Sequence, residues 1–341
     1  MTESVILPNG VSVSVEQTVP VSVNPDRDLH GPAVVRAGNG DILLSHQDSD
    51  QHRGGDGYVH QWRSTDEGFS WKDEGPAADW RDRGLDSLFG DCALAPDGRL
   101  VMFVQRREPL GGDAGILATW YSISSDHGRT WEEQGPVDDS DEHAAMYVRS
   151  VQTRDGVMYG GVWSRHGSTL YVSANDGTTW QKRSVMFPPT YPDFEQMPEA
   201  GPPFYPHAVF CPDGTLLGMI YHTPPLHRCY TTRSTDNGFS WAPIQPRPEL
   251  PLWAPRMNRI DDDLMIVTGR DTGEGATVAW FSGDNGENWV NKLIVDRPAH
   301  RGSYAYTDSI ALDEDRFWIF TSSPQSEGKG DIVGVLLRLD R

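Results

Sequence analysis

A short turn-like motif recurs five times and constrains the fold of this chain more than any other feature. Its pattern is Ser-x-Asp-x-Gly-x-x-Trp, and the third copy has Asn175 in place of the aspartate. The copies occupy residues 64–71, 124–131, 173–180, 234–241 and 282–289. Their starts are about 50 or 60 residues apart, a period that is typical of blades or arrays of repeated units.

Each copy of the motif predicts a β-hairpin turn. The Ser and Asp side chains can accept hydrogen bonds from turn amides, and the glycine supplies a positive φ. The Trp starts the next strand and buries a large apolar ring. Alternating strands such as residues 58–62 precede the motif, so a repeated unit explains the pattern better than five independent hairpins. The motif therefore indicates the fold and has no chemical role.

The composition excludes several classes of partner. A formal net charge of −20 argues against nucleic acid or an anionic membrane, because both need clustered Lys and Arg. Three cysteines cannot all pair with one another, so disulfides are not the main stabilising feature. The first 25 residues lack the basic and apolar regions of a signal peptide, and no run of about 18 apolar residues is present. We therefore expect a cytoplasmic protein, although a protein whose leader had been removed would look the same.

The order of strands and turns along the chain predicts six units. Their inner strands are expected to begin near His30, Asp91, Arg149, His207, Arg256 and Asp308. The sixth unit lacks the motif and ends at its third strand, residues 331–339, so the spare strand at residues 11–23 can supply the fourth. This pairing would close the ring and cover two sheet edges. The sequence thus predicts an all-β fold in a single domain, residues 1–341: a six-bladed β-propeller of four-stranded antiparallel blades, closed by an N-terminal strand.

Residues at the start of each innermost strand of a propeller point into the central channel. The candidates in this chain are all polar: His30, Asp91, Arg149, His207, Arg256, Tyr306 and Asp308. A single polar residue at such a position is usually a hydrogen-bonded strand-start residue. Seven of them in six units indicate a ligand site in the channel.

The repeated motif on six four-stranded units resembles the Asp boxes, or BNR repeats, of the sialidase (neuraminidase) superfamily. The resemblance runs from about residue 11 to the C-terminus. It implies that Tyr306, in Tyr-Thr-Asp, is the nucleophile and that the acid is Asp50 or Asp56 in the loop before the first motif. The base position of the family falls near residues 205–207, where no carboxylate is present; Glu195 and Glu199 precede it, out of register.

The arginines that bind the sialic acid carboxylate in this superfamily are mostly absent. His30 occupies the position of the first arginine, and Asp48-Ser49-Asp50 that of the second. The two later positions fall near His222 and Arg270, of which only the second is an arginine. Because a planar anion is held best by several bidentate guanidinium groups, the resemblance implies a substrate other than a sialoside.

We therefore expect a glycoside hydrolase that acts on a non-sialic-acid glycan in the central channel. Its candidate catalytic residues are Tyr306, Asp50, Asp56, His30 and His207. Its candidate substrate-binding residues are Asp91, Arg149, Arg256, Asp308, His222 and Arg270. The expected partner is an oligosaccharide or polysaccharide, and the sequence gives no oligomeric state.

Two alternatives to the hydrolase stay open. A polysaccharide lyase would use a histidine and Tyr306 as base and acid, with Arg149 or Arg256 neutralising a uronate carboxylate. A non-catalytic carbohydrate-binding propeller would have a channel without a paired acid and base. Imidazole and carboxylate suit Zn or Mn, but no His-x-Glu-x-x-His spacing occurs, so no cofactor and no metal are predicted.

Overall fold

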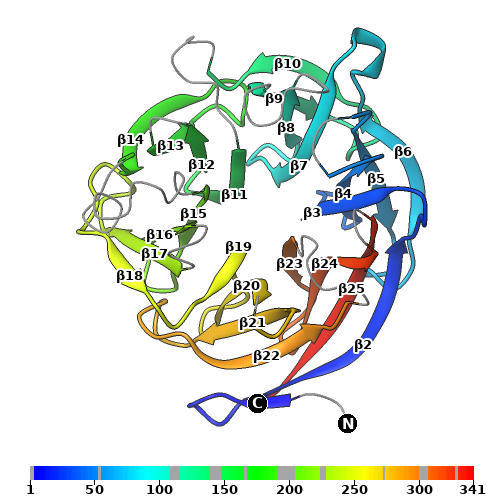
Figure 1. Cartoon of the computed structure of the whole chain (residues 1–341). Helices are drawn as coiled ribbons and strands as arrows, with labels where there is room; N and C mark the ends of the chain where they lie inside the picture. Colours follow the sequence, from blue (N-terminus) through cyan, green and yellow to red (C-terminus); the bar gives the residue numbers. More distant parts are fainter. Residues whose placement is uncertain are drawn as a thin grey trace.

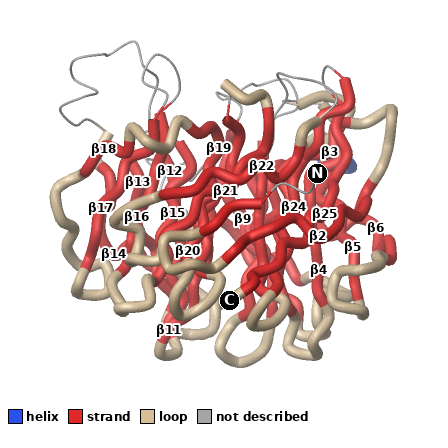
Figure 2. Tube along the Cα trace, turned by 90° about the horizontal axis from the view of Figure 1, so that it is seen from below, coloured by secondary structure: helices blue, strands red, loops and turns tan. Residues whose placement is uncertain are grey.

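The computed structural model of this protein is an all-β propeller in which antiparallel sheets surround a central axis (Figure 1). It describes residues 4–52, 55–107, 116–138, 147–164, 167–189, 204–222, 228–271, 273–298, 306–326 and 329–341. The strands span the height of the propeller, and the loops gather at its two ends (Figure 2). The helix in the described residues is a single 3-10 turn, η1 (Arg81–Arg83). Within that part of the chain, no helix has the length and apolarity that crossing a membrane requires.

Four blades form separate four-stranded antiparallel sheets. The first contains β7 (Asp86–Leu94), β8 (Leu100–Arg107), β9 (Ile116–Ser124) and β10 (Glu132–Pro136). The second contains β11 (Tyr147–Arg154), β12 (Val157–Ser164), β13 (Gly167–Ser173) and β14 (Gln181–Phe187). The third contains β15 (Phe204–Phe210), β16 (Leu216–His222), β17 (Arg228–Ser234) and β18 (Gln245–Arg247). The fourth contains β19 (Leu252–Arg259), β20 (Met265–Asp271), β21 (Ala276–Ser282) and β22 (Val290–Asp296).

The remaining strands form one nine-stranded sheet. One half contains β3 (Asp28–Arg36), β4 (Ile42–Ser49), β5 (Tyr58–Ser64) and β6 (Lys72–Ala78). The other half contains β1 (Ser4–Ile6), β2 (Ser12–Ser22), β23 (Thr307–Ala311), β24 (Arg316–Ser326) and β25 (Lys329–Asp340). A single parallel pair, Gly330 with Asp28, joins the halves. The prediction of six separate blades is therefore wrong, because this backbone bridge merges the first and last groups of strands and leaves four separate blades.

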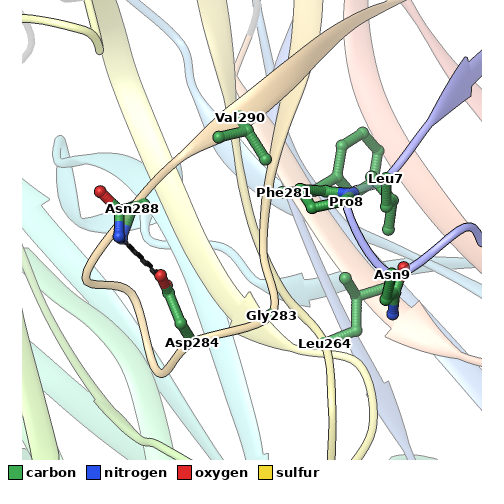
Figure 3. A pocket seen from close by; sticks show the side chains of 9 residues that line it. All are labelled: Leu7, Pro8, Asn9, Leu264, Phe281, Gly283, Asp284, Asn288 and Val290. Carbon is green, nitrogen blue, oxygen red and sulfur yellow. Dashed lines mark hydrogen bonds between the residues drawn. The ribbon is translucent and has the colours of Figure 1, made fainter.

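The N-terminal strand β2 pairs with the C-terminal strand β25 in antiparallel register, from Ser12 with Asp340 to Ser22 with Ile332. This is the pairing expected of the closing strand, and it joins the two ends of the chain within one sheet. The hairpin between β1 and β2 packs against the neighbouring blade, where Leu7 belongs to a buried cluster with Leu264 and Phe281. A small cavity of about 190 Å³ lies beside this contact (Figure 3).

The five repeated motifs form the turn between the third and fourth strands of their blades. In each copy the first serine hydroxyl accepts a hydrogen bond from the glycine amide, over 2.7–3.0 Å. The Asp or Asn side chain accepts one from the amide four residues later, over 2.8–3.0 Å. The glycine φ lies between +75° and +91°. The side-chain acceptors and the positive φ predicted from the sequence are thus confirmed.

The motif glycines also dock each blade on the preceding one. A Cβ added to Gly68 would lie 2.7 Å from Nε1 of Trp318, and that indole N–H donates to the Glu67 carbonyl. At Gly286 an added Cβ would lie 2.5 Å from a methyl carbon of Leu217 in the preceding blade. The motif therefore needs glycine for two reasons: its backbone conformation and the close approach of the neighbouring blade.

The innermost strands β3, β7, β11, β15 and β19 each contain a shift of register. The shift in β3 lies between His30 and Ala33, and that in β19 between Trp253 and Arg256. Residues at these bulges have positive φ, as at Ser150 and Tyr205. A bulge bends its strand and re-aims the side chains that follow it. The channel residues consequently lie in two layers.

Candidate functional site

The lower layer of the channel is a buried ionic network centred on Arg256. Its guanidinium donates to both carboxylate oxygens of Asp91, over 3.0 and 3.1 Å, and to Asp308 over 3.0 Å. Asp308 also accepts hydrogen bonds from the Val34 amide and the Asn258 side chain. Burial alone would lower the pKa of Arg256, but the carboxylates of Asp308 and Asp91 outweigh it and raise that pKa above its ordinary value. Three predicted substrate-binding residues are thus bound to one another, at exposures of 5% or less.

His207 belongs to the same lower layer. Its Nδ1 lies 2.6 Å from the hydroxyl of Ser150, and the Ser150 amide donates to Asp91. The imidazole is fully buried. The structure therefore places this predicted catalytic histidine beside the ionic network.

A cavity of about 250 Å³ lies next to this ionic network. It is lined by the C-terminal parts of the innermost strands, including Gln152 and Arg259. The turns of the repeated motifs lie at this same end of the strands, whereas Asp28 and His30, at the start of β3, lie toward the opposite end. Arg256 and Asp308 of the network themselves line this cavity.

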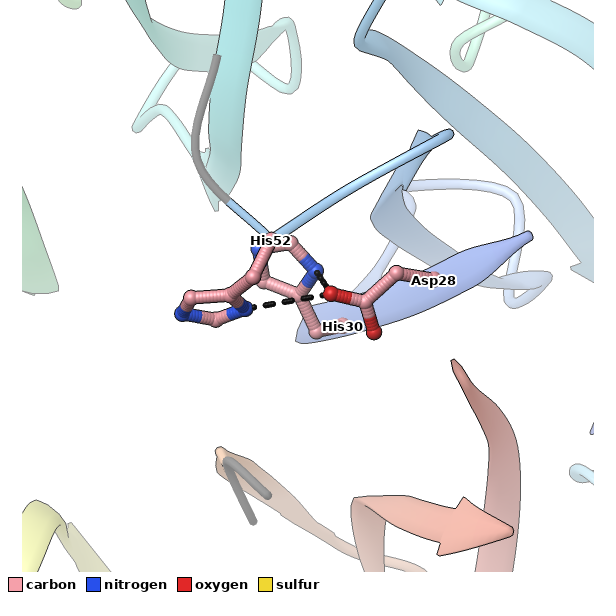
Figure 4. Close-up of side chains that lie close together, drawn as sticks. All are labelled: Asp28, His30 and His52. Carbon is pink, nitrogen blue, oxygen red and sulfur yellow. Dashed lines mark hydrogen bonds and ion pairs between the residues drawn. The ribbon is translucent and has the colours of Figure 1, made fainter. Parts of the chain in front are cut away.

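The upper layer contains Asp28 and His30 from β3, His52 from the loop after β4, and Tyr306 just before β23. One carboxylate oxygen of Asp28 lies 3.1 Å from Nδ1 of His52 and 3.3 Å from Nδ1 of His30 (Figure 4). The other ring nitrogen of His52 lies 3.3 Å from the Tyr306 hydroxyl. Tyr205 donates its hydroxyl hydrogen to the Tyr306 oxygen over 3.3 Å. Asp28, His52, Tyr306 and Tyr205 therefore form one hydrogen-bonded chain.

The aromatic rings of these hydrogen-bonded residues pack against one another and against neighbouring rings. His52 and Tyr306 are stacked, with centroids 5.8 Å apart and an interplanar angle of 7°. The His30 ring lies 4.3 Å from that of His52, and Tyr205 stacks on Tyr221 at 5.6 Å. Burial of Asp28 would raise its pKa, but His30 first and then His52 outweigh this and hold the pKa of the carboxyl well below its usual range. Asp28 is thus a carboxylate that supports two imidazoles.

Asp28, His52 and Tyr306 are arranged like the residues that activate a nucleophile in enzymes. The ionised Asp28 oxygen accepts a hydrogen bond and orients Nδ1–H of His52 toward itself, which leaves Nε2 as the basic atom. That basic atom faces the Tyr306 hydroxyl, at a distance from which a proton can be transferred. A base held by a third group, beside a hydroxyl, is the geometry that nucleophilic catalysis uses.

Asp50 and Asp56 shape the loop that carries His52. The Asp50 amide donates to the Asp56 carboxylate over 3.0 Å, and the Asp56 amide donates to Asp50 over 3.4 Å. Arg27 donates to Asp56 over 2.7 Å, and this hydrogen bond is the main cause that lowers the Asp56 pKa. A general acid needs a raised pKa, so the environment of Asp56 favours a structural role in the loop. Asp50 is exposed on the same loop.

The other predicted substrate-binding residues, Arg149, His222 and Arg270, lie on β11, β16 and β20. Arg270 places its guanidinium carbon 4.3 Å from the ring centroid of Trp253, its cross-strand partner. His222 is fully buried and meets the ring of Tyr230 edge-on at 5.6 Å. The backbone of Arg149 pairs with Gly161. The side chain of Arg149, and both Glu195 and Glu199, lie outside the described residues.

Sequence reasoning missed Asp28, His52 and Tyr205. Asp28 and His30 are two residues apart on one strand, so their side chains share a face, and this alternation was a usable signal. His52 is a loop residue, and Tyr205 is displaced by a bulge. Neither carries a local sequence signal for the channel.

No family model matches this chain, and no curated protein matches it. Several solved structures are similar to it in fold. A protein of unknown function from Dyadobacter fermentans is similar with a TM-score of 0.79 and 15% identity, covering 98% of this chain and 100% of that one. An α-L-arabinanase from Penicillium chrysogenum, complexed with arabinobiose, is similar with a TM-score of 0.66 and 16% identity, covering 94% and 98%. A variant of the NanB sialidase from Streptococcus pneumoniae is similar with a TM-score of 0.70 and 10% identity, covering 94% and 70%.

These identities show similarity of fold alone. The fold is a β-propeller of the kind found in glycoside hydrolases such as sialidases, arabinanases and arabinofuranosidases. The particular activity therefore has to be inferred from the residues of the site.

Proposed function

We propose that this protein is a glycoside hydrolase that cleaves a glycan without sialic acid at the upper layer of its central channel. The observation that carries the proposal is the hydrogen-bonded chain Asp28–His52–Tyr306. The similarity of its fold to an arabinanase and to sialidases supports the same class of reaction. These three residues supply what such reactions need: Tyr306 is the nucleophile, His52 is the base beside it, and Asp28 orients the base.

In the proposed reaction Asp28 holds the Nδ1–H of His52, and Nε2 of His52 takes the proton of the Tyr306 hydroxyl. The phenolate oxygen bonds to the anomeric carbon as the bond from that carbon to the leaving oxygen breaks, and the leaving oxygen takes a proton from a second group. Asp50, on the loop that carries His52, is the candidate for this second group. Water then gives a proton back to the second group and replaces the Tyr306 oxygen at the anomeric carbon, while that oxygen regains its proton from His52; this is the second half of a retaining mechanism.

The preference for a substrate without sialic acid is supported by the lower layer. The guanidinium of Arg256 already binds Asp91 and Asp308, so it is not free to hold a substrate carboxylate. His30 stands where a sialidase would have an arginine. Binding a sialoside needs several guanidinium groups directed at one carboxylate.

A panel of neutral aryl-glycosides, arabinans, sialosides and uronate polysaccharides tests the proposal. We expect reducing ends from a neutral glycan, and a loss of about 100-fold or more in kcat for Tyr306→Phe and for His52→Gln. Tyr121→Phe is the matched control, because it removes a tyrosine hydroxyl that donates only to the Thr178 carbonyl elsewhere in the propeller. Release of sialic acid, or full activity in both site variants, would overturn the proposal.

A polysaccharide lyase is the second candidate, and one observation favours it. The described titratable groups of the upper layer are two imidazoles and two phenols around the single carboxylate of Asp28, and a lyase uses such groups as base and acid. It would create an unsaturated product with new ultraviolet absorbance on uronate polysaccharides. A hydrolase releases reducing ends without that absorbance, so the same panel separates the two.

A further inference from the structure

Asp28, His30 and His52 place three possible metal ligands together in the upper layer. The strand β3 contributes the first two, and because they are two residues apart their side chains lie on the same face. The loop after β4 contributes the third. Their ligand atoms all lie within 4.8 Å of one another.

The separations of these atoms fit a small divalent cation. Nδ1 of His52 and Nδ1 of His30 lie 3.1 and 3.3 Å from the same Asp28 oxygen. Zinc binds histidine nitrogen and carboxylate oxygen at about 2.0–2.2 Å, so neighbouring ligands of a tetrahedral site are about 3.3–3.5 Å apart. Small side-chain rotations would therefore let the three groups surround an ion. The ion would take the place of the protons on the two Nδ1 atoms.

The chemistry and the surroundings of the three groups point in the same direction. Two imidazoles and one carboxylate are ligands that suit zinc and similar divalent transition metals. His30 is 1% exposed and Asp28 6%, while the His52 side chain is 12% exposed. The partly exposed side leaves room for a fourth ligand. Tyr306 lies at the outer nitrogen of His52, where metal-bound histidines usually have a hydrogen-bonding partner.

We propose that Asp28, His30 and His52 form a binding site for Zn²⁺ or a similar divalent transition-metal ion. Binding has a consequence for catalysis that rests on the proposed function. An imidazole bound to the ion through Nδ1 keeps its remaining proton on Nε2, so His52 cannot take the proton of Tyr306. The ion should therefore inhibit turnover.

Isothermal titration with ZnCl₂ tests the binding directly, on full-length protein treated with chelator and carrying no histidine tag. We expect one Zn²⁺ per chain, and a dissociation constant raised at least ten-fold in Asp28→Asn, His30→Gln and His52→Gln. His60→Gln is the matched control, because His60 also lies beside carboxylates, at 2.7 Å from Asp73 and 3.6 Å from Asp48, but outside this site. Its affinity for Zn²⁺ should stay that of the unchanged protein.

Visible absorption of the protein with CoCl₂ gives a measurement that needs no variant, since cobalt held in a tetrahedral nitrogen and oxygen site absorbs far more strongly than aqueous cobalt. Absence of both the titration heat and this spectrum would overturn the metal site. So would unchanged affinity in the three ligand variants, with circular dichroism showing that they are folded. Zn²⁺ binding with unchanged turnover on an active substrate would refute the proposed role of His52 and leave the metal site intact.

Discussion

Replacing Arg256 with methionine should destabilise the protein by about 3–5 kcal/mol, the cost of removing one partner from a buried ionic group. The guanidinium is 5% exposed and donates to two aspartates that are 4% and 2% exposed. Without it, Asp91 and Asp308 stay buried with their charges unbalanced. The magnitude follows from this burial, because an exposed pair would contribute only about 0–1 kcal/mol.

Denaturation by urea at pH 7, followed by tryptophan fluorescence, measures this change. Arg338→Met is the matched control, since its pair with Asp340 is more than half exposed, and its free energy of unfolding should change by less than about 1 kcal/mol. Burial already raises the pKa of Asp308 in the folded protein, and Arg256 opposes this effect, so in Arg256→Met the pKa of that carboxyl should rise further. The variant should therefore regain stability as the pH falls toward about 4, where the unfolded chain also takes up protons.

A second variant separates lost charge balance from lost packing. The triple variant Arg256→Met, Asp91→Asn and Asp308→Asn removes the unbalanced charges and should recover part of the stability that Arg256→Met loses. A loss of under about 1 kcal/mol in Arg256→Met would refute the structural role of the lower layer. In that case Arg256 would again be a candidate substrate-binding residue.

Two further predictions concern the turns and the pH dependence. Gly68→Ala should cost more than Gly98→Ala, because both have φ near +90° but only Gly68 lies against Trp318; we expect about 1 kcal/mol at Gly98 and 1–3 kcal/mol more at Gly68, and equal losses in urea would contradict the docking role of the turn. Burial lowers the pKa of His46 to about 4, and its neutral ring accepts from the Trp62 indole. Protein stability should therefore fall by about 3 kcal/mol from pH 6.5 to pH 4 through this group, and His46→Gln, which has no proton to gain, should flatten that part of the profile.

The architecture was predictable because the repeated motif carries its own geometry. The five turns needed a serine, a carboxylate or amide, and a glycine at fixed spacing, and each makes the expected hydrogen bonds. The pairing of β2 with β25 followed from counting strands in the last unit. The merging of two groups of strands did not follow, since it depends on the single backbone pair of Gly330 with Asp28.

The candidate site was less predictable, because bulges decide which side chains meet. The polar residues at the strand starts were evident, but the register shifts that divide them into two layers depend on backbone conformations such as those of Ser150 and Tyr205. The shifts in β7 and β19 lie just before Asp91 and Arg256, whose side chains bind each other. His52 itself is placed by hydrogen bonds within its loop, which no sequence pattern describes.

The catalytic role of the Tyr306 hydroxyl can be measured as the turnover of Tyr306→Phe on the glycan that the unchanged protein cleaves. The variant keeps the ring that stacks on His52 and loses only the hydroxyl, so fold and substrate affinity should persist. We expect a fall in kcat of about 100-fold or more, with little change in the urea midpoint. A kcat equal to that of the unchanged protein would contradict the role of the Asp28–His52–Tyr306 chain in catalysis.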